Sequence, residues 1–179
     1  MHKAFPITDL ELEDLATEAV RNVFSTMLDA DASLVQSREV NKADYSNGFR
    51  LPLDIDETLI AGTVGFIGKL MGVIYIFMDL PMAIKFTSRL LDLSDDEIEA
   101  EGHETVNDAI GELTNMIVGA FKNDLSNRGF DCRMTIPSII RGSNYTIEPS
   151  EDALRRIFKF DCEGSSFVID ILIKEEHTI

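Results

Sequence analysis

The chain has 179 residues, of which 45% are hydrophobic and 27% are charged. This composition suits a globular protein with a sizeable core, and we expect one domain over residues 1–179. The formal net charge of −16 argues against nucleic acid and anionic membranes as partners, because both would repel an acidic surface.

Cysteine and histidine are sparse. Cys132 and Cys162 lie far apart without CxxC spacing, and the chain has three histidines. No zinc ligand set is recognisable, so we interpret both cysteines as reduced, buried thiols. The N-terminal residues turn acidic before any apolar run begins, so we expect no signal peptide and a cytoplasmic location.

Residues 8–54 predict a helix, a strand and a polar connection. Thr8 or Asp9 can cap a helix that runs to about Ala30. Its apolar stripe comprises Leu12, Leu15, Ala19, Val23 and Met27. A short strand over about 34–40 follows, and residues 41–54 contain turn signals.

The apolar run 59–78 is about as long as a membrane helix must be. Lys69 lies at its centre, and glycines interrupt it at Gly62, Gly65, Gly68 and Gly72. Its Val, Ile and Phe content favours two buried strands, over 58–67 and 70–79, joined by a tight turn.

Two shorter helical segments are expected next. Pro81 suits the first turn of a helix over about 81–91. The inward-facing residues of that helix would be Ile84, Leu90 and Leu91. Ser94 is followed three residues later by Glu97, which is the spacing of a capping box, and the chain breaks again near Gly102.

A long helix is predicted over 104–127. Glu112 and Asn115 lie three residues apart, side by side on its surface, and Asp108 and Gly119 extend this row by one turn in each direction. The row points nearly opposite the apolar stripe, which comprises Val106, Ile110, Leu113, Ile117, Ala120 and Phe121. Such a row is most often a solvated helix face, and a binding face is the alternative.

Glycines within this helix favour the second interpretation. Gly111 and Gly119 each destabilise a helix by roughly 1 kcal/mol relative to alanine, so helix stability does not explain them. We expect them to let another surface approach the backbone closely. Gly129 would end the helix.

The last third of the chain predicts strands. We expect strands over 130–136 and 138–141, and a hairpin of 154–162 with 166–174 around Glu163-Gly164-Ser165. Because strands and helices come in blocks, the fold class should be α+β, with a largely antiparallel sheet packed against long helices. We expect 166–174 to be an edge strand, which would favour a homodimer.

The segment 111–119, GELTNMIVG, resembles the signature helix of the CheC/CheX/FliY chemotaxis phosphatases. Segments 69–78, 83–91 and 137–142 resemble flanking elements of CheX, so the similarity spans roughly 55–175. The family pattern has four positions in order: an acidic residue or Ser, then Glu, then Asn, then Pro. The residues at these positions here are Asp108, Glu112, Asn115 and Pro137. The first helix has Glu18 and Arg21 where a second site would have Glu and Asn, so the chain is most like single-site CheX.

The resemblance implies a CheC-like fold and a phosphatase that hydrolyses the aspartyl-phosphate of a CheY-type response regulator. Asn115 would position the attacking water, and Glu112 would pair with a lysine of the regulator. Asp108, Gly111 and Gly119 would contact the partner. We expect no cofactor or metal in this chain, because the metal ion, Mg²⁺, would belong to the regulator.

Two other functions remain open. One is a non-catalytic module of the same fold that binds a response regulator or joins a flagellar switch. The other is a small-molecule hydrolase, which is disfavoured because no Ser/His or Cys/His constellation is recognisable. Phosphate release from a phosphorylated receiver domain would distinguish all three.

Overall fold

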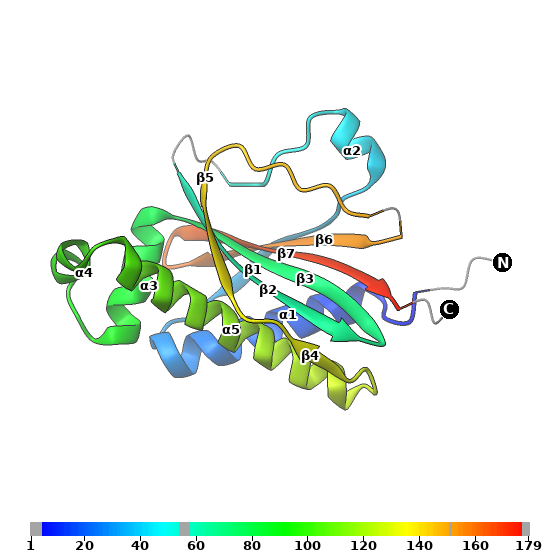
Figure 1. The fold of residues 1–179 in the computed structure, drawn as a ribbon, viewed down its shortest axis with the longest axis horizontal. Coiled ribbons are helices and arrows are strands. Elements are labelled where there is room, and N and C mark those ends of the chain that lie inside the picture. The colour runs from blue at the N-terminus through cyan, green and yellow to red at the C-terminus, as the bar shows by residue number, and fades with distance from the viewer. Residues whose placement is uncertain (1–4, 54–57, 151, 177–179) are drawn as a thin grey trace.

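The computed structural model describes residues 5–53, 58–150 and 152–176. Its centre is a seven-stranded sheet with the longer helices on one face, while the short helix α2 and connecting loops lie over the other face (Figure 1). This arrangement confirms the expected α+β class. Within these ranges, every helix is too short or too polar to cross a membrane.

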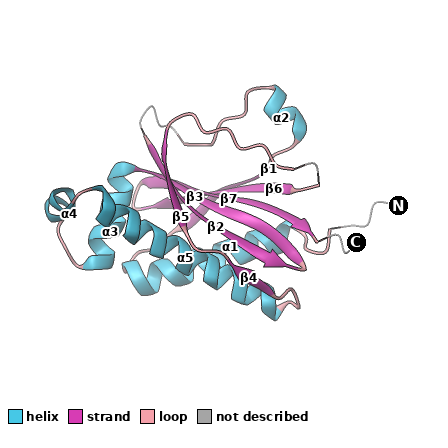
Figure 2. Cartoon of the chain, in the orientation of Figure 1, coloured by secondary structure: helices cyan, strands magenta, loops and turns pink. Residues whose placement is uncertain are grey.

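Along the chain, several strands or several helices often follow one another, rather than one strand after each helix (Figure 2). Their bounds are α1 Asp9–Val23, a π-helical turn Phe24–Leu28, β1 Ser33–Glu39, α2 Lys42–Ser46, β2 Leu59–Gly68, β3 Leu70–Asp79, α3 Leu80–Leu91, α4 Asp95–Glu101, α5 His103–Asn127, β4 Cys132–Met134, β5 Ser138–Gly142, β6 Leu154–Cys162 and β7 Ser165–Glu175. The elements predicted from periodicity are therefore present, and the apolar run 59–78 is the expected hairpin.

The strand order is β1-β6-β7-β3-β2-β4, and β5 also pairs with β2. Strand β7 bonds to β6 on one side and to β3 on the other, so the prediction that it forms an edge is wrong. Both of its faces are buried, which is typical of a central strand. The homodimer therefore loses the support of an edge strand at β7, and it stays an untested prediction that the resemblance to CheX alone suggests.

The helices bury their apolar faces against this sheet. In α5 the predicted stripe is confirmed, except that Ala120 is half-buried. Thr114 lies directly over β2, where a Cβ added at Gly62 would fall 1.9 Å from the Thr114 hydroxyl oxygen. Gly62 therefore lets α5 approach the sheet closely, which holds the helix at a fixed depth.

Two details of the helical stripes differ from prediction. The first helix ends in a π-helical turn, which is wider than an α-helical turn and shifts the buried stripe onto Phe24 and Leu28. Met27, predicted to be buried, is 45% exposed. In α3 the buried residues are Met82, Ala83, Phe86 and Thr87. Ile84 and Leu90 are half-buried, and Leu91, the last residue of α3 before the left-handed Asp92, is exposed.

A second, smaller core covers the face of the sheet that carries no long helix. At its centre Arg155 bonds to Asp170, with its Nε 2.9 Å from Oδ1, and both side chains are almost completely buried. The same guanidinium donates to the Tyr45 hydroxyl at 2.9 Å and to the Ile147 carbonyl at 2.7 Å. It thereby ties α2 and the segment before β6 to the sheet.

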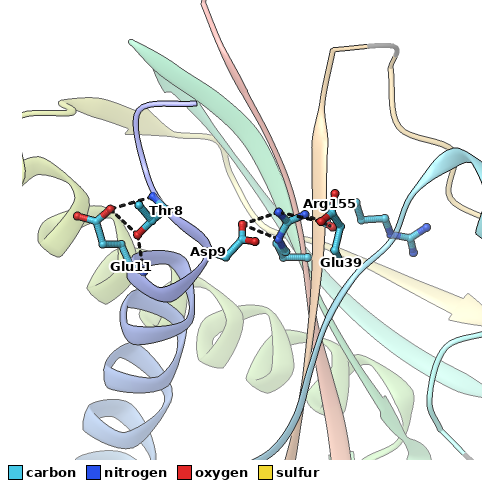
Figure 3. Close-up of polar contacts among 6 residues, drawn as sticks. Thr8, Asp9, Glu11, Glu39 and Arg155 are labelled. Atoms are coloured by element: carbon cyan, nitrogen blue, oxygen red, sulfur yellow. Dashed lines mark hydrogen bonds and ion pairs between the residues drawn. The ribbon is translucent and has the colours of Figure 1, made fainter. Parts of the chain in front are cut away.

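Arg155 and Arg156 are neighbours in β6 and point to opposite faces. Arg156 reaches the helical face, where it pairs with Asp9 of α1 and with Glu39 of β1. Figure 3 shows Asp9 beside the Thr8–Glu11 capping box, with the side chain of Arg155 extending away on the other side of β6. Unlike Asp170, both acidic partners of Arg156 remain exposed.

Candidate functional site

The site is built on α5, the longest helix. It begins after Gly102 and ends before Gly129, both of which have a positive φ that L residues rarely adopt. Glu112 and Asp108 are exposed and Asn115 is half-buried. Across the described residues, none of these three side chains takes part in a hydrogen bond or ion pair, so their polar groups are available to a partner.

One row of α5 runs beneath the sheet edge formed by β4 and β5, which cross this helix in Figure 1. The row follows four-residue spacing and comprises His103, Asn107, Gly111, Asn115 and Gly119. Asn115 lies one turn from each glycine. The crossing chain contacts the row both before and after Asn115.

Residues of β5 and of the segment before it contact the N-terminal half of this row. Arg141 of β5 donates to Asn107 Oδ1 at 2.8 Å and lies 3.0 Å from His103 Nδ1. A Cβ added at Gly111 would lie 4.0 Å from Pro137 Cβ and 4.0 Å from Ile139 Cδ1. These contacts cover the N-terminal half of the row.

At the other end, a Cβ added at Gly119 would lie 3.9 Å from Met134 Sδ. Residues 135 and 136 therefore cross the row at the level of Asn115.

The sheet edge is broken at this level. Strand β5 pairs with Leu59–Thr63 of β2 and β4 pairs with Phe66–Gly68, leaving residues 135–137 outside the regular ladder. Thr135 bridges the gap: its N–H donates to the Gly65 carbonyl at 2.8 Å, and its hydroxyl accepts from the Gly65 N–H at 2.9 Å. The next residue, Ile136, is 85% exposed.

The structure thus brings the predicted residues together around one stretch of α5. Asp108, Glu112 and Asn115 are accessible, and Pro137 lies against the same helix. Gly111 is buried and Gly119 is half-buried, and the surface that approaches them is the β4–β5 segment of this chain. Their contact with a partner remains a prediction.

Sequence reasoning did not single out Thr135 and Ile136. We expected a strand over 130–136, whereas β4 ends at Met134. Pro137 carried a usable signal, since proline cannot donate to a ladder and marks edges or bulges within strands. What could not be read locally is that the break faces Asn115, because that depends on how the β4–β5 segment crosses α5.

The first helix carries no equivalent site. Glu18 and Arg21 form an exposed ion pair of 3.5 Å on α1. The acid is therefore paired, and an arginine stands where α5 has the amide of Asn115. Among the described residues, no three His, Cys, Asp or Glu side chains are grouped so that they could hold a metal ion.

The fold and this helix define a protein of the CheC-like class. The family model "Chemotaxis phosphatase CheX" matches residues 60–161. A search of curated proteins gave no match.

Solved structures share the fold over nearly their whole length. The chemotaxis protein CheX of Vibrio vulnificus is 24% identical with a TM-score of 0.72, over 92% of this chain and 99% of that one. The structure of the CheX-CheY-BeF3-Mg²⁺ complex of Borrelia burgdorferi is 24% identical with a TM-score of 0.61, over 92% of this chain and 98% of that one. FliY of Thermotoga maritima is 18% identical with a TM-score of 0.66, over 94% of this chain and 92% of that one.

The family model covers more than half of the chain, and it matches the region that holds α5 and the β4–β5 segment. The chain therefore belongs to the CheX family of chemotaxis phosphatases.

Proposed function

We propose that this protein accelerates hydrolysis of the aspartyl-phosphate on a CheY-type response regulator. The observation that carries the proposal is the Glu112–Asn115 pair on a rigid helix, at the level where the adjoining sheet edge is broken. Neither side chain bonds to any other residue that the structure describes. Membership of the CheX family and the Borrelia complex of CheX with CheY support the choice of partner.

In the proposed mechanism the chain supplies orientation rather than a nucleophile. A water molecule attacks the phosphorus atom, the bond to the aspartyl oxygen breaks, and the products are aspartate and inorganic phosphate. Asn115 would hold that water in line, because its carboxamide oxygen accepts and its NH₂ donates hydrogen bonds. Glu112 would pair with a lysine beside the phosphorylated aspartate and set the orientation of docking. Mg²⁺ would belong to the regulator.

The alternative is a non-catalytic module that binds a regulator or assembles in a flagellar switch. Fold similarity to FliY and to the FliM middle domain favours keeping this alternative. The discriminating measurement is the half-life of phosphorylated receiver domains with and without this protein. A shortened half-life supports the phosphatase, whereas binding without shortening supports the module.

The role of Glu112 gives a first prediction. Glu112→Ala should weaken binding to the beryllofluoride form of the regulator and slow dephosphorylation, each by about tenfold, because a charge-assisted contact across the interface is lost. Glu99→Ala, which removes another exposed acid, from α4, is the matched control and should change neither. The loss should shrink as salt is raised, since ions screen the charge pair. An unchanged affinity for Glu112→Ala would contradict this role.

The cysteines give a second prediction. Cys132 and Cys162 are both buried and unpaired, and burial raises the pKa of each thiol, so both should stay protonated and unreactive at neutral pH. Replacing both with serine should leave dephosphorylation unchanged and lower the free energy of unfolding by about 1–3 kcal/mol, because hydroxyls replace apolar sulfur in the core. Lost turnover in a folded double variant would reveal a chemical role for a thiol.

A further inference from the structure

The exposed side chain of Ile136 differs from other exposed aliphatic residues in its surroundings. Single apolar residues at a surface are ordinary, and Leu10 on α1 and Val35 on β1 are of that kind. Among the residues that the structure describes, Ile136 is the most exposed large hydrophobic residue, at 85%, and it projects from the break that faces Asn115. An accessible acid, an accessible amide and an accessible aliphatic group therefore occur together.

The backbone around Ile136 is held firmly on both sides. On one side, Thr135 is bonded twice to Gly65 of β2, through its N–H and through its hydroxyl. On the other side, Pro137 has a restricted φ and lies against Gly111 of α5. A side chain presented on a rigid backbone loses little conformational freedom on binding, which is the property expected of an interface anchor.

We propose that Ile136 is the apolar anchor that seats the receiver domain of the response regulator over Asn115. The proposal rests on the proposed function, which makes this face of α5 the docking surface. Interfaces concentrate affinity in a few side chains that fill pockets on the partner, surrounded by contacts that contribute little energy but exclude water. Ile136 would fill a pocket beside the phosphorylated aspartate, while Glu112 supplies the charged contact.

Charge complementarity identifies the kind of surface that fits. Asp108 and Glu112 are both exposed on α5, the helix that the segment carrying Ile136 crosses, and the formal net charge of the chain is −16. The receiver should therefore present an apolar pocket bordered by lysine or arginine. A receiver face with acidic residues around its pocket would be repelled, which would provide selectivity among regulators.

The test compares Ile136→Ser with Val35→Ser, which removes an exposed aliphatic side chain at the opposite edge of the sheet. Affinity is measured for a CheY-type receiver domain loaded with beryllofluoride and Mg²⁺, and dephosphorylation is followed as a function of receiver concentration. Ile136→Ser should weaken binding about tenfold and raise the half-saturating concentration equally, with the maximal rate unchanged. Ile136→Leu should restore both, and Val35→Ser should match the wild type.

The outcomes separate this inference from the proposed function. If the wild type accelerates dephosphorylation and Ile136→Ser binds as tightly as the wild type, the docking role is overturned and the phosphatase stands. If the wild type binds without accelerating dephosphorylation, the phosphatase fails and the affinity comparison still decides the role of Ile136. If the wild type does neither with any receiver of its organism, both are overturned.

Discussion

Asn115→Ala should abolish most catalysed dephosphorylation while leaving binding to the regulator intact. The variant removes the carboxamide that would orient the water but keeps Glu112 and the surrounding surface. Loss of one preorganised polar group typically lowers the rate by about 10²–10³-fold, and we expect a loss in this range. Because Asn115 is half-buried and bonded to no described side chain, the free energy of unfolding should change by no more than about 0.5 kcal/mol.

Two further variants sharpen this test. Asn115→Asp should be no more active than the alanine variant, because a carboxylate would face the phosphoryl oxygens with like charge. Asn123→Ala removes the same side chain two turns along α5, where Asn123 is exposed, and should behave as the wild type. Decay rates of the phosphorylated regulator and affinities for its beryllofluoride form report the two effects separately. Near-normal turnover in folded Asn115→Ala would place the site elsewhere.

The largest effect on stability is expected at Arg155. Arg155→Met would leave the carboxylate of Asp170 completely buried without its partner, and the Tyr45 hydroxyl and Ile147 carbonyl would each lose a donor. Removing one member of a buried ion pair destabilises a protein by about 3–5 kcal/mol. Denaturant unfolding followed by circular dichroism would measure this loss.

The neighbouring arginine provides a matched control. Arg156→Met makes the same change one residue away, but Asp9 and Glu39 are exposed and can be solvated, so the loss should stay within about 1 kcal/mol. The double variant Arg155→Met with Asp170→Leu should recover much of the stability, because no unpaired charge remains in the core. Equal losses for the two single variants would show that burial of Asp170 does not decide the outcome.

Local periodicity was sufficient to predict the long elements. The hairpin of β2 and β3, helix α5 and the hairpin of β6 and β7 all lie where hydrophobic spacing placed them. The Glu112–Asn115 row was also predictable, because residues three apart on a helix are neighbours whatever the rest of the fold does.

What the sequence did not predict depends on distant parts of the chain. The central place of β7 follows from its pairing with β3, which lies about a hundred residues earlier. Asp170 is an acid within the apolar run of β7, which is a weak sequence signal for a buried ion pair. Its partner, Arg155, could not be identified without knowing how the strands of the sheet pair. The exposure of Met27 required a π-helical turn that simple helical spacing does not anticipate.

The break between β4 and β5 has a further consequence for how the protein behaves at high concentration. A continuous outer strand offers a row of free N–H and C=O groups on which chains can stack into aggregates. Here that side is split into pieces of three and five residues, separated by a segment that contains Pro137, which has no N–H to donate. The interruption at the level of Asn115 therefore also removes a template for cross-β growth, so the proposed docking site and colloidal stability would share one structural origin.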